Sequence, residues 1–146
     1  MSLFLQTAFE EAEAAGKRGE VPVGAVLVKD GRILARAGNR VEELKDPSAH
    51  AEILVLREAG KILCEPRLIG CDLYVTLEPC PMCATAISFA RVRRLYFGAY
   101  DPKGGGVDHG PKIYGQPTCH HQPEVVGGLE EVRAGDLLRS FFLNRR

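Results

Sequence analysis

The sequence predicts an α/β fold in which a sheet of about five strands carries helices on both faces, a three-layer α/β/α arrangement. Helix-like and strand-like periods alternate along the chain, in the order helix, hairpin, helix, strand, helix, strand, loop, strand, helix. The 146 residues are 45% hydrophobic and 26% charged, which is the composition of a soluble globular domain. We therefore expect a single domain, residues 1–146, without a linker or an internal repeat.

The N-terminal part predicts a helix followed by a hairpin. Residues 2–17 place apolar side chains on one helical face with glutamates between them, and the helix should end near Gly16. Residues 23–39 form two strands about the dipeptide Asp30-Gly31, which supplies the positive backbone angles of a tight turn. The first helix should cover the sheet that this hairpin begins.

The middle of the chain predicts a helix, a strand and a helix. Residues 45–60 form the first of these helices, with Ser48 as the N-cap candidate and Gly60 at its end. Residues 71–78 are a short β-rich run. Residues 81–92 have helical composition and begin with a proline, which a first helical turn accepts.

The C-terminal part predicts two strands, a long loop and a final helix. Residues 93–100 form a strand, and residues 101–123 are rich in Gly, Pro and His and show no period. Loops of this length in compact domains commonly carry function. A short strand over 124–128 and a helix over 134–146 complete the chain.

Charge and cysteine usage narrow the function classes. The formal net charge is zero with a pI near 6.9, which argues against bulk electrostatic binding of long nucleic acids. The N-terminus lacks a secretory hydrophobic region, and no apolar run reaches the ~18 residues of a membrane span. We expect a cytoplasmic protein whose five cysteines are packed thiols or metal ligands.

One histidine and two cysteines have the spacing of a zinc site. Cys80 and Cys83, at i and i+3 of a helix start, can place both sulfurs on one metal ion, and His50 would add an imidazole. Three protein ligands leave the fourth tetrahedral position to water, the form of a catalytic site. Two alternatives remain: a thioredoxin-like dithiol, or a structural zinc site with a fourth ligand. Candidates for that ligand are Cys64, Cys71, Cys119, His120 and His121.

Glu52 decides what a metal at this site could do. A carboxylate beside zinc-bound water, without being a ligand itself, can take a proton from that water. Positions i and i+2 of a regular helix face nearly opposite ways, so His50 and Glu52 can share a site only if His50 lies in the first turn. Ser48 as the N-cap would place it there. Without zinc, Glu52 would be an ordinary exposed helix glutamate.

The motifs "HAE" and "PCPMC" match the H-x-E…P-C-x-x-C signature of zinc-dependent nucleobase deaminases. Further segments, "EVPVGAVLV", "AHAEI", "LYVTLEPC" and "FGAYDPK", resemble the bacterial tRNA adenosine deaminases, of the cytidine/deoxycytidylate deaminase superfamily. The resemblance is dense from Glu20 to Lys103 and returns at "LLRSFFLNRR". It implies a cytidine deaminase-like fold with a mixed sheet, and hydrolysis of the wobble adenosine of an arginine tRNA to inosine.

The resemblance also implies roles for residues. His50, Cys80 and Cys83 would hold one Zn²⁺ per subunit, and Glu52 would move the proton. The positions that match substrate-binding residues of the family are Asn39, Ala51, Pro79, Asp101, Lys103, Phe142, Arg145 and Arg146. Family members are homodimers whose RNA site, for the tRNA anticodon loop, uses both subunits.

The sequence departs from the family over 104–122, where it reads "GGGVDHGPKIYGQPTCHHQ". This loop lies near the substrate in the family, so the departure bears on substrate choice and leaves the zinc chemistry unaffected. The leading hypothesis is a tRNA adenosine deaminase. The alternative is a deaminase of a free nucleobase or nucleoside, of the cytosine, guanine or cytidine class, built on the same fold.

Overall fold

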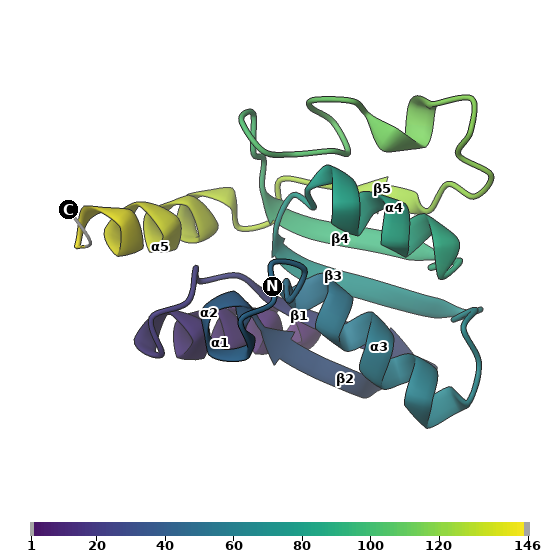
Figure 1. Cartoon of the computed structure of the whole chain (residues 1–146), viewed down its shortest axis with the longest axis horizontal. Coiled ribbons are helices and arrows are strands. Elements are labelled where there is room, and N and C mark those ends of the chain that lie inside the picture. Colours follow the sequence, from purple (N-terminus) through teal and green to yellow (C-terminus); the bar gives the residue numbers. More distant parts are fainter. Residues whose placement is uncertain (1, 145–146) are drawn as a thin grey trace.

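The computed structural model describes residues 2–144, which fold into a three-layer α/β/α arrangement (Figure 1). The strands are β1 (Gly24–Lys29), β2 (Arg32–Gly38), β3 (Cys71–Leu77), β4 (Arg94–Ala99) and β5 (Glu124–Val126). The helices are α1 (Leu3–Lys17), α2 (Val41–Leu44), α3 (Ala51–Leu63), α4 (Pro81–Phe89) and α5 (Glu131–Leu143), with a 3₁₀ turn η1 (Ile113–Gly115). The predicted α/β class and the five strands are confirmed.

The sheet is mixed, with strand order β2-β1-β3-β4-β5. β1 pairs antiparallel with β2 and with β3, whereas β3, β4 and β5 run parallel. The hairpin between β1 and β2 turns at Asp30 (φ 51°) and Gly31 (φ 74°), the two positive angles that the sequence predicts. The parallel strands need crossovers, and α4 supplies the one between β3 and β4.

Alternate residues of β1 face the two helical layers. Ala25 and Leu27 belong to the main core with α3 and α4, whereas Val26 and Val28 pack toward α1. In Figure 1, α3 and α4 lie side by side on one face of the sheet, with α1 on the other. Both α3 and α4 begin at the same end of the strands, so their N-termini lie close together.

The helix predicted over 45–60 is displaced in the structure. It begins at Ala51 rather than after Ser48, because the Ser48 N–H and hydroxyl both bind Asp46 Oδ1, at 2.8 and 2.7 Å. It also runs past Gly60 to Leu63. Cys64, in the left-handed conformation, ends it with N–H bonds to the carbonyls of the last turn.

Other boundaries also differ from the sequence prediction. The last helix begins at Glu131, three residues before the predicted start at 134, and the prediction's final residues 145–146 lie outside the described range. Helix α2 was not predicted, since four residues are too few to show a helical period. The segment 101–123 contains η1 and is otherwise irregular, as predicted.

Within the described residues, none of the helices combines the length and the apolar character that a membrane crossing requires.

The packing of α1 on β1 depends on Gly24. A Cβ atom there would lie 2.0 Å from the carbonyl oxygen of Ala8 and 2.5 Å from the amide nitrogen of Ala12. Gly24→Ala should therefore lower the free energy of unfolding by about 1–3 kcal/mol, as overpacking does. Gly115→Ala is the matched control, because its Cβ meets nothing within 4 Å, and it should change stability by less than about 0.5 kcal/mol. Urea unfolding of both variants measures this, and equal midpoints would contradict the close packing.

Candidate active site

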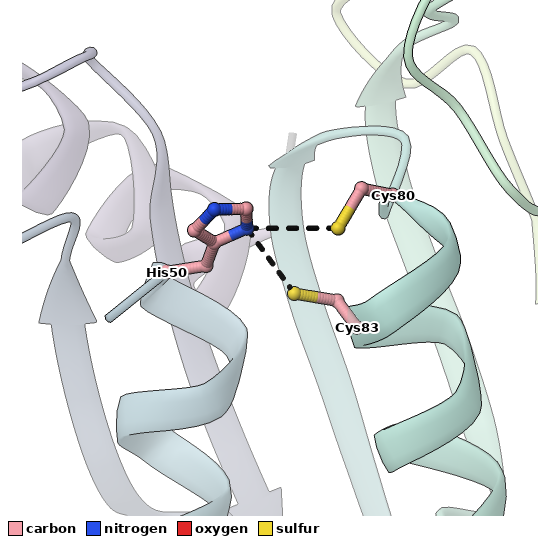
Figure 2. A group of neighbouring side chains, drawn as sticks. All are labelled: His50, Cys80 and Cys83. Atoms are coloured by element: carbon pink, nitrogen blue, oxygen red, sulfur yellow. Dashed lines mark hydrogen bonds between the residues drawn. The ribbon is translucent and has the colours of Figure 1, made fainter. Parts of the chain in front are cut away.

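Three donor atoms converge where α3 and α4 begin. His50 is the residue before α3, Cys80 is the residue before α4, and Cys83 lies in the first turn of α4. His50 Nδ1 lies 3.6 Å from Cys80 Sγ and 3.5 Å from Cys83 Sγ. Figure 2 shows the imidazole directed from the start of α3 toward both sulfurs. The sequence prediction that these three residues form one group is therefore consistent with the geometry.

The donor spacing fits zinc. Bonds of about 2.3 Å to sulfur and about 2.0–2.1 Å to nitrogen, at a tetrahedral angle, separate the two donors by about 3.6 Å. The observed separations of 3.6 and 3.5 Å match that value. All three donor atoms lie within 4.8 Å of one another. One imidazole and two cysteine sulfurs are donors that zinc prefers, so the site fits one Zn²⁺ per chain.

Electrostatics already favour a thiolate at this position. The hydrogen bond from Cys83 lowers the pKa of Cys80 below its usual value, and the bond with His50 adds to this against the effect of burial. The pKa of Cys83 is raised, because its thiol donates to Cys80 and is buried. The Cys83 thiol would have to lose its proton for both sulfurs to bind a zinc ion, so metal binding would release protons.

Glu52 lies beside the three donors without being one of them. Glu52 is 4% exposed, and its carboxylate hydrogen-bonds with the Cys83 side chain. Burial raises its pKa to about 7, with the Cys80 thiolate adding to the effect. His50 has an extended backbone (φ −74°, ψ 151°), so its side chain leaves the chain before the helix starts and shares a side with Glu52. The predicted proximity is present, but His50 itself, and not Ser48, occupies the N-cap position.

No fourth protein ligand is present among residues 2–144. There, His50, Cys80 and Cys83 form the one group of three or more metal-binding side chains. Cys119 and His121 lie instead near the end of α4, where the Ser88 hydroxyl donates to the His121 carbonyl at 2.7 Å. The His121 ring donates to the Val92 carbonyl at 2.7 Å. Cys119 and His121 therefore lie where the loop contacts the end of α4. The metal site has three protein ligands, which leaves a fourth position for water, as in catalytic zinc sites.

Asn39 binds the start of α3 and also lines the cavity that contains His50 and Cys80. Its side-chain oxygen accepts the N–H of Ala51 at 2.8 Å and so satisfies a free donor at the start of α3. That bond fixes the orientation of the amide and leaves its NH₂ group as a donor. Asn39 is 8% exposed and lines the cavity, whereas Ala51 is fully buried.

The cavity has a volume of about 750 Å³, and the predicted site residues that line it are Asn39, His50, Glu52, Cys80 and Asp101. It is lined by Gly19, Glu20, Val21, Val23, Asn39, Val41, Glu42, Pro47, His50, Glu52, Leu77, Glu78, Cys80, Asp101, Gly104 and Phe141. A neighbouring groove of about 800 Å³, between α5 and the segment after β4, is lined by Lys103 and Phe142 and shares Asp101 with the cavity. The predicted Arg145 and Arg146 lie outside the described residues.

The Pro79 carbonyl and Asp101 are already engaged within the protein. The Pro79 oxygen accepts the N–H of Gly106 at 2.8 Å, which leaves its second lone pair for another donor. The Asp101 carboxylate accepts the backbone N–H groups of Lys103 and Gly104, at 3.2 and 3.0 Å. The Lys103 side chain is exposed. Both carbonyl and carboxylate thus shape the turn after β4 at the mouth of the cavity.

Two cavity residues were not predicted from the sequence. Glu20 is 3% exposed and accepts the N–H groups of Glu42 and Glu43, at 3.1 and 2.9 Å, so it holds the start of α2. Glu78 is 2% exposed. Burial opposes its charge, but hydrogen bonds from the Asp101 backbone and other donors keep its pKa below the usual range. Both lie inside segments that resemble the family, but a sequence alone does not separate a buried glutamate from an exposed one.

The fold and the three-ligand site with its neighbouring carboxylate define the class of zinc-dependent deaminases. The family model for the cytidine and deoxycytidylate deaminase zinc-binding region matches residues 1–99. The tRNA-specific adenosine deaminase of Agrobacterium fabrum is 59% identical over 143 residues, 98% of this chain and 94% of the relative. The chain belongs to the bacterial tRNA-specific adenosine deaminase family.

Two solved structures are similar. One, from work on A-to-I editing by tRNA:A34 deaminases at the wobble position of transfer RNA, is 60% identical with a TM-score of 0.91, covering 92% of this chain and 98% of that one. The other, a guanine deaminase from Nitrosomonas europaea, is 25% identical with a TM-score of 0.80, covering 94% and 82%. The fold is therefore shared with a protein that is named for a different base.

Removing one thiolate should remove the metal. Cys83→Ala should lose its zinc and lower Tm by about 5 °C or more, since metal binding is coupled to folding and each kcal/mol corresponds to about 2–4 °C in a chain of this size. Cys71→Ala is the control, because Cys71 is equally buried in the core but is not part of the donor group. Metal analysis and thermal unfolding of both variants give the answer. A full complement of zinc in Cys83→Ala would refute the ligand assignment.

Proposed function

We propose that this chain hydrolyses adenosine to inosine at the wobble position of tRNA, with one zinc ion per subunit. The observation that carries the proposal is the buried Glu52 carboxylate beside a three-ligand metal site at a cavity of about 750 Å³. Zinc sites with three protein ligands and an adjacent acid are built for hydrolysis. The name of the Agrobacterium relative and the subject of the 60% identical structure support tRNA as the substrate.

His50, Cys80 and Cys83 would hold the zinc ion, since they form the donor group. Zinc supplies the Lewis acidity that activates a water molecule for attack on C6 of the adenine ring. The reaction consumes one water and releases ammonia, so the two water protons must move, one to N1 of the ring and one to the departing amine.

Glu52 is positioned to move both protons. A pKa of about 7, raised by burial, allows the carboxylate to accept a proton and to give it up again near neutral pH. Its burial also keeps bulk water from competing for the proton. We therefore assign Glu52 as the general base and then the general acid of the same reaction.

The cavity walls would hold the base and its flanking nucleotides. The free NH₂ group of Asn39 can donate to a ring nitrogen of the base, because its oxygen is bound to Ala51. The second lone pair of the Pro79 carbonyl can accept from the leaving ammonia. Asp101, Lys103 and Phe142 line the cavity and the adjoining groove, which is where a splayed anticodon loop would continue. Arg145 and Arg146 follow α5 in the sequence and are proposed to reach phosphates.

We also propose that the protein acts as a homodimer on an arginine tRNA in the cytoplasm, as the family resemblance implies. Helix α4 exposes Met82 (39%) in its first turn and Phe89 (73%) at its last residue, apolar surface that a second subunit could cover. Sedimentation of the purified protein checks the dimer. Assay against a panel of tRNAs checks the identity of the substrate.

Glu52→Gln should separate metal binding from chemistry. The variant should keep its fold and one zinc per chain, because the carboxylate is not a ligand, and should lose turnover by at least ~10²-fold, as expected for a missing general acid/base. Glu58→Gln, an exposed glutamate on the same helix, should keep full turnover. Inosine formation in tRNA and metal content measure both effects, and normal turnover in Glu52→Gln would refute the role.

The same assay should include free guanine, cytosine, adenine and their nucleosides, because a guanine deaminase shares the fold. Ammonia release measures activity on the small molecules. We expect inosine in tRNA and little release from free bases. Strong activity on a free base with none on tRNA would overturn the proposed substrate.

Lys103→Ala should weaken tRNA binding in a salt-dependent way. One lost contact with a single-stranded phosphate should reduce the slope of log KM against log salt by about 0.7. Lys61→Ala is the control, because Lys61 is also exposed but lines neither the cavity nor the adjoining groove. Steady-state kinetics across a salt series compare the two variants. An unchanged slope in Lys103→Ala would remove this lysine from the RNA site.

A further inference from the structure

The Glu78 side chain is fully buried and accepts hydrogen bonds from one segment of the loop after β4. Its Oε1 accepts the Asp101 N–H at 3.0 Å and the His109 ring Nδ1–H at 2.8 Å. Its Oε2 accepts the N–H groups of Val107, Asp108 and His109, at 3.2, 2.9 and 3.2 Å. Four backbone donors and one imidazole thus converge on a single carboxylate, and a carboxylate is the one side chain that only accepts.

The same segment is pressed against the turn that carries the metal ligands. A Cβ atom on Gly105 would lie 2.4 Å from Glu78 Oε2, and one on Gly106 would lie 2.6 Å from the backbone of Pro81. The Gly106 N–H also donates to the Pro79 carbonyl at 2.8 Å. Glycine is therefore required for the contact at both positions, and the loop closes directly over the residues that flank Cys80.

We propose that Glu78 is a positioning residue that holds residues 101–109 against the metal-ligand turn and so fixes Asp101 and Lys103 relative to Cys80. Glu78 precedes Cys80 by two residues, so one short segment bears both the loop's anchor and a metal ligand. Asp101 is bound to Glu78 directly through its backbone, and its carboxylate in turn orders Lys103 and Gly104. The inference rests on the proposed function, in which these loop residues meet the substrate.

Glu78→Gln tests this role with almost no change in volume. A glutamine has one NH₂ group, and in either orientation that group faces N–H donors that it cannot satisfy. The amides whose acceptor oxygen is replaced, either Asp101 alone or Val107, Asp108 and His109 together, should then exchange with deuterium at least ~10-fold faster, since each bond to a charged group contributes about that factor to protection. KM for tRNA should rise at least ~10-fold because the substrate-facing residues are misplaced. Zinc should remain at one ion per chain.

Ser88→Ala is the control. Ser88 binds the distal end of the same loop through the His121 carbonyl, far along the sequence from residues 101–109. It should leave KM and the exchange of residues 101–109 unchanged. A merely structural loss in Glu78→Gln would lower zinc content and the active fraction together at constant KM, and that result would overturn the proposal. Unchanged exchange of the four amides would also overturn it.

Gly105→Ala disturbs the same contact from the loop side, and it is the second test if Glu78→Gln does not fold. Its added methyl group should displace the loop from Glu78 and raise both KM and amide exchange; an unchanged KM would refute the positioning role. Failure of the proposed function is seen separately, as wild-type enzyme that does not act on tRNA. In that event the KM comparison on the base that the wild type does accept decides the role of Glu78.

Discussion

The meeting of two helix N-termini at one point is the constraint on which the site depends. Helices α3 and α4 lie on the same face of the sheet and begin at the same end of the strands, so His50 and Cys80 are brought together by the sheet rather than by the local sequence. The partial positive charge of each helix start favours anionic groups there, which suits a thiolate at Cys80. The donor group is therefore held by two helices that pack on the sheet, and substrate contacts can lie on loops around it.

Two buried carboxylates stabilise the walls of the cavity by the same means. Glu20 accepts the first N–H groups of α2, and Glu78 accepts those of the loop after β4. Each carboxylate supplies acceptors for backbone N–H groups that have no partner within a helix or strand. Apart from the bond of Glu78 to the His109 ring, these two carboxylates bind backbone N–H groups, so the shape of the walls depends little on the identity of the neighbouring side chains.

Sequence reasoning predicted the architecture, since the hairpin turn at Asp30-Gly31 and the periods of the long helices are local properties. It also predicted that His50, Cys80 and Cys83 form one group, because one imidazole and two thiolates are the ligands that zinc prefers. It misplaced the start of α3, since Ser48 binds Asp46 and its capping role passes to Asn39, twelve residues before Ala51. Partners that distant, like those of Glu78, are set by tertiary structure and leave no periodic signal.

The segment 101–123 is fastened to the fold at several points along its length. Glu78 binds its beginning, the Tyr114 hydroxyl donates to the Ala84 carbonyl in its middle, and His121 binds Val92 at its end. The entropy lost on closing a loop depends on the length between fixed ends, so this segment behaves as a series of short loops. Insertions between the fastened points should be tolerated, and evolution can vary the loop there without disturbing the metal site.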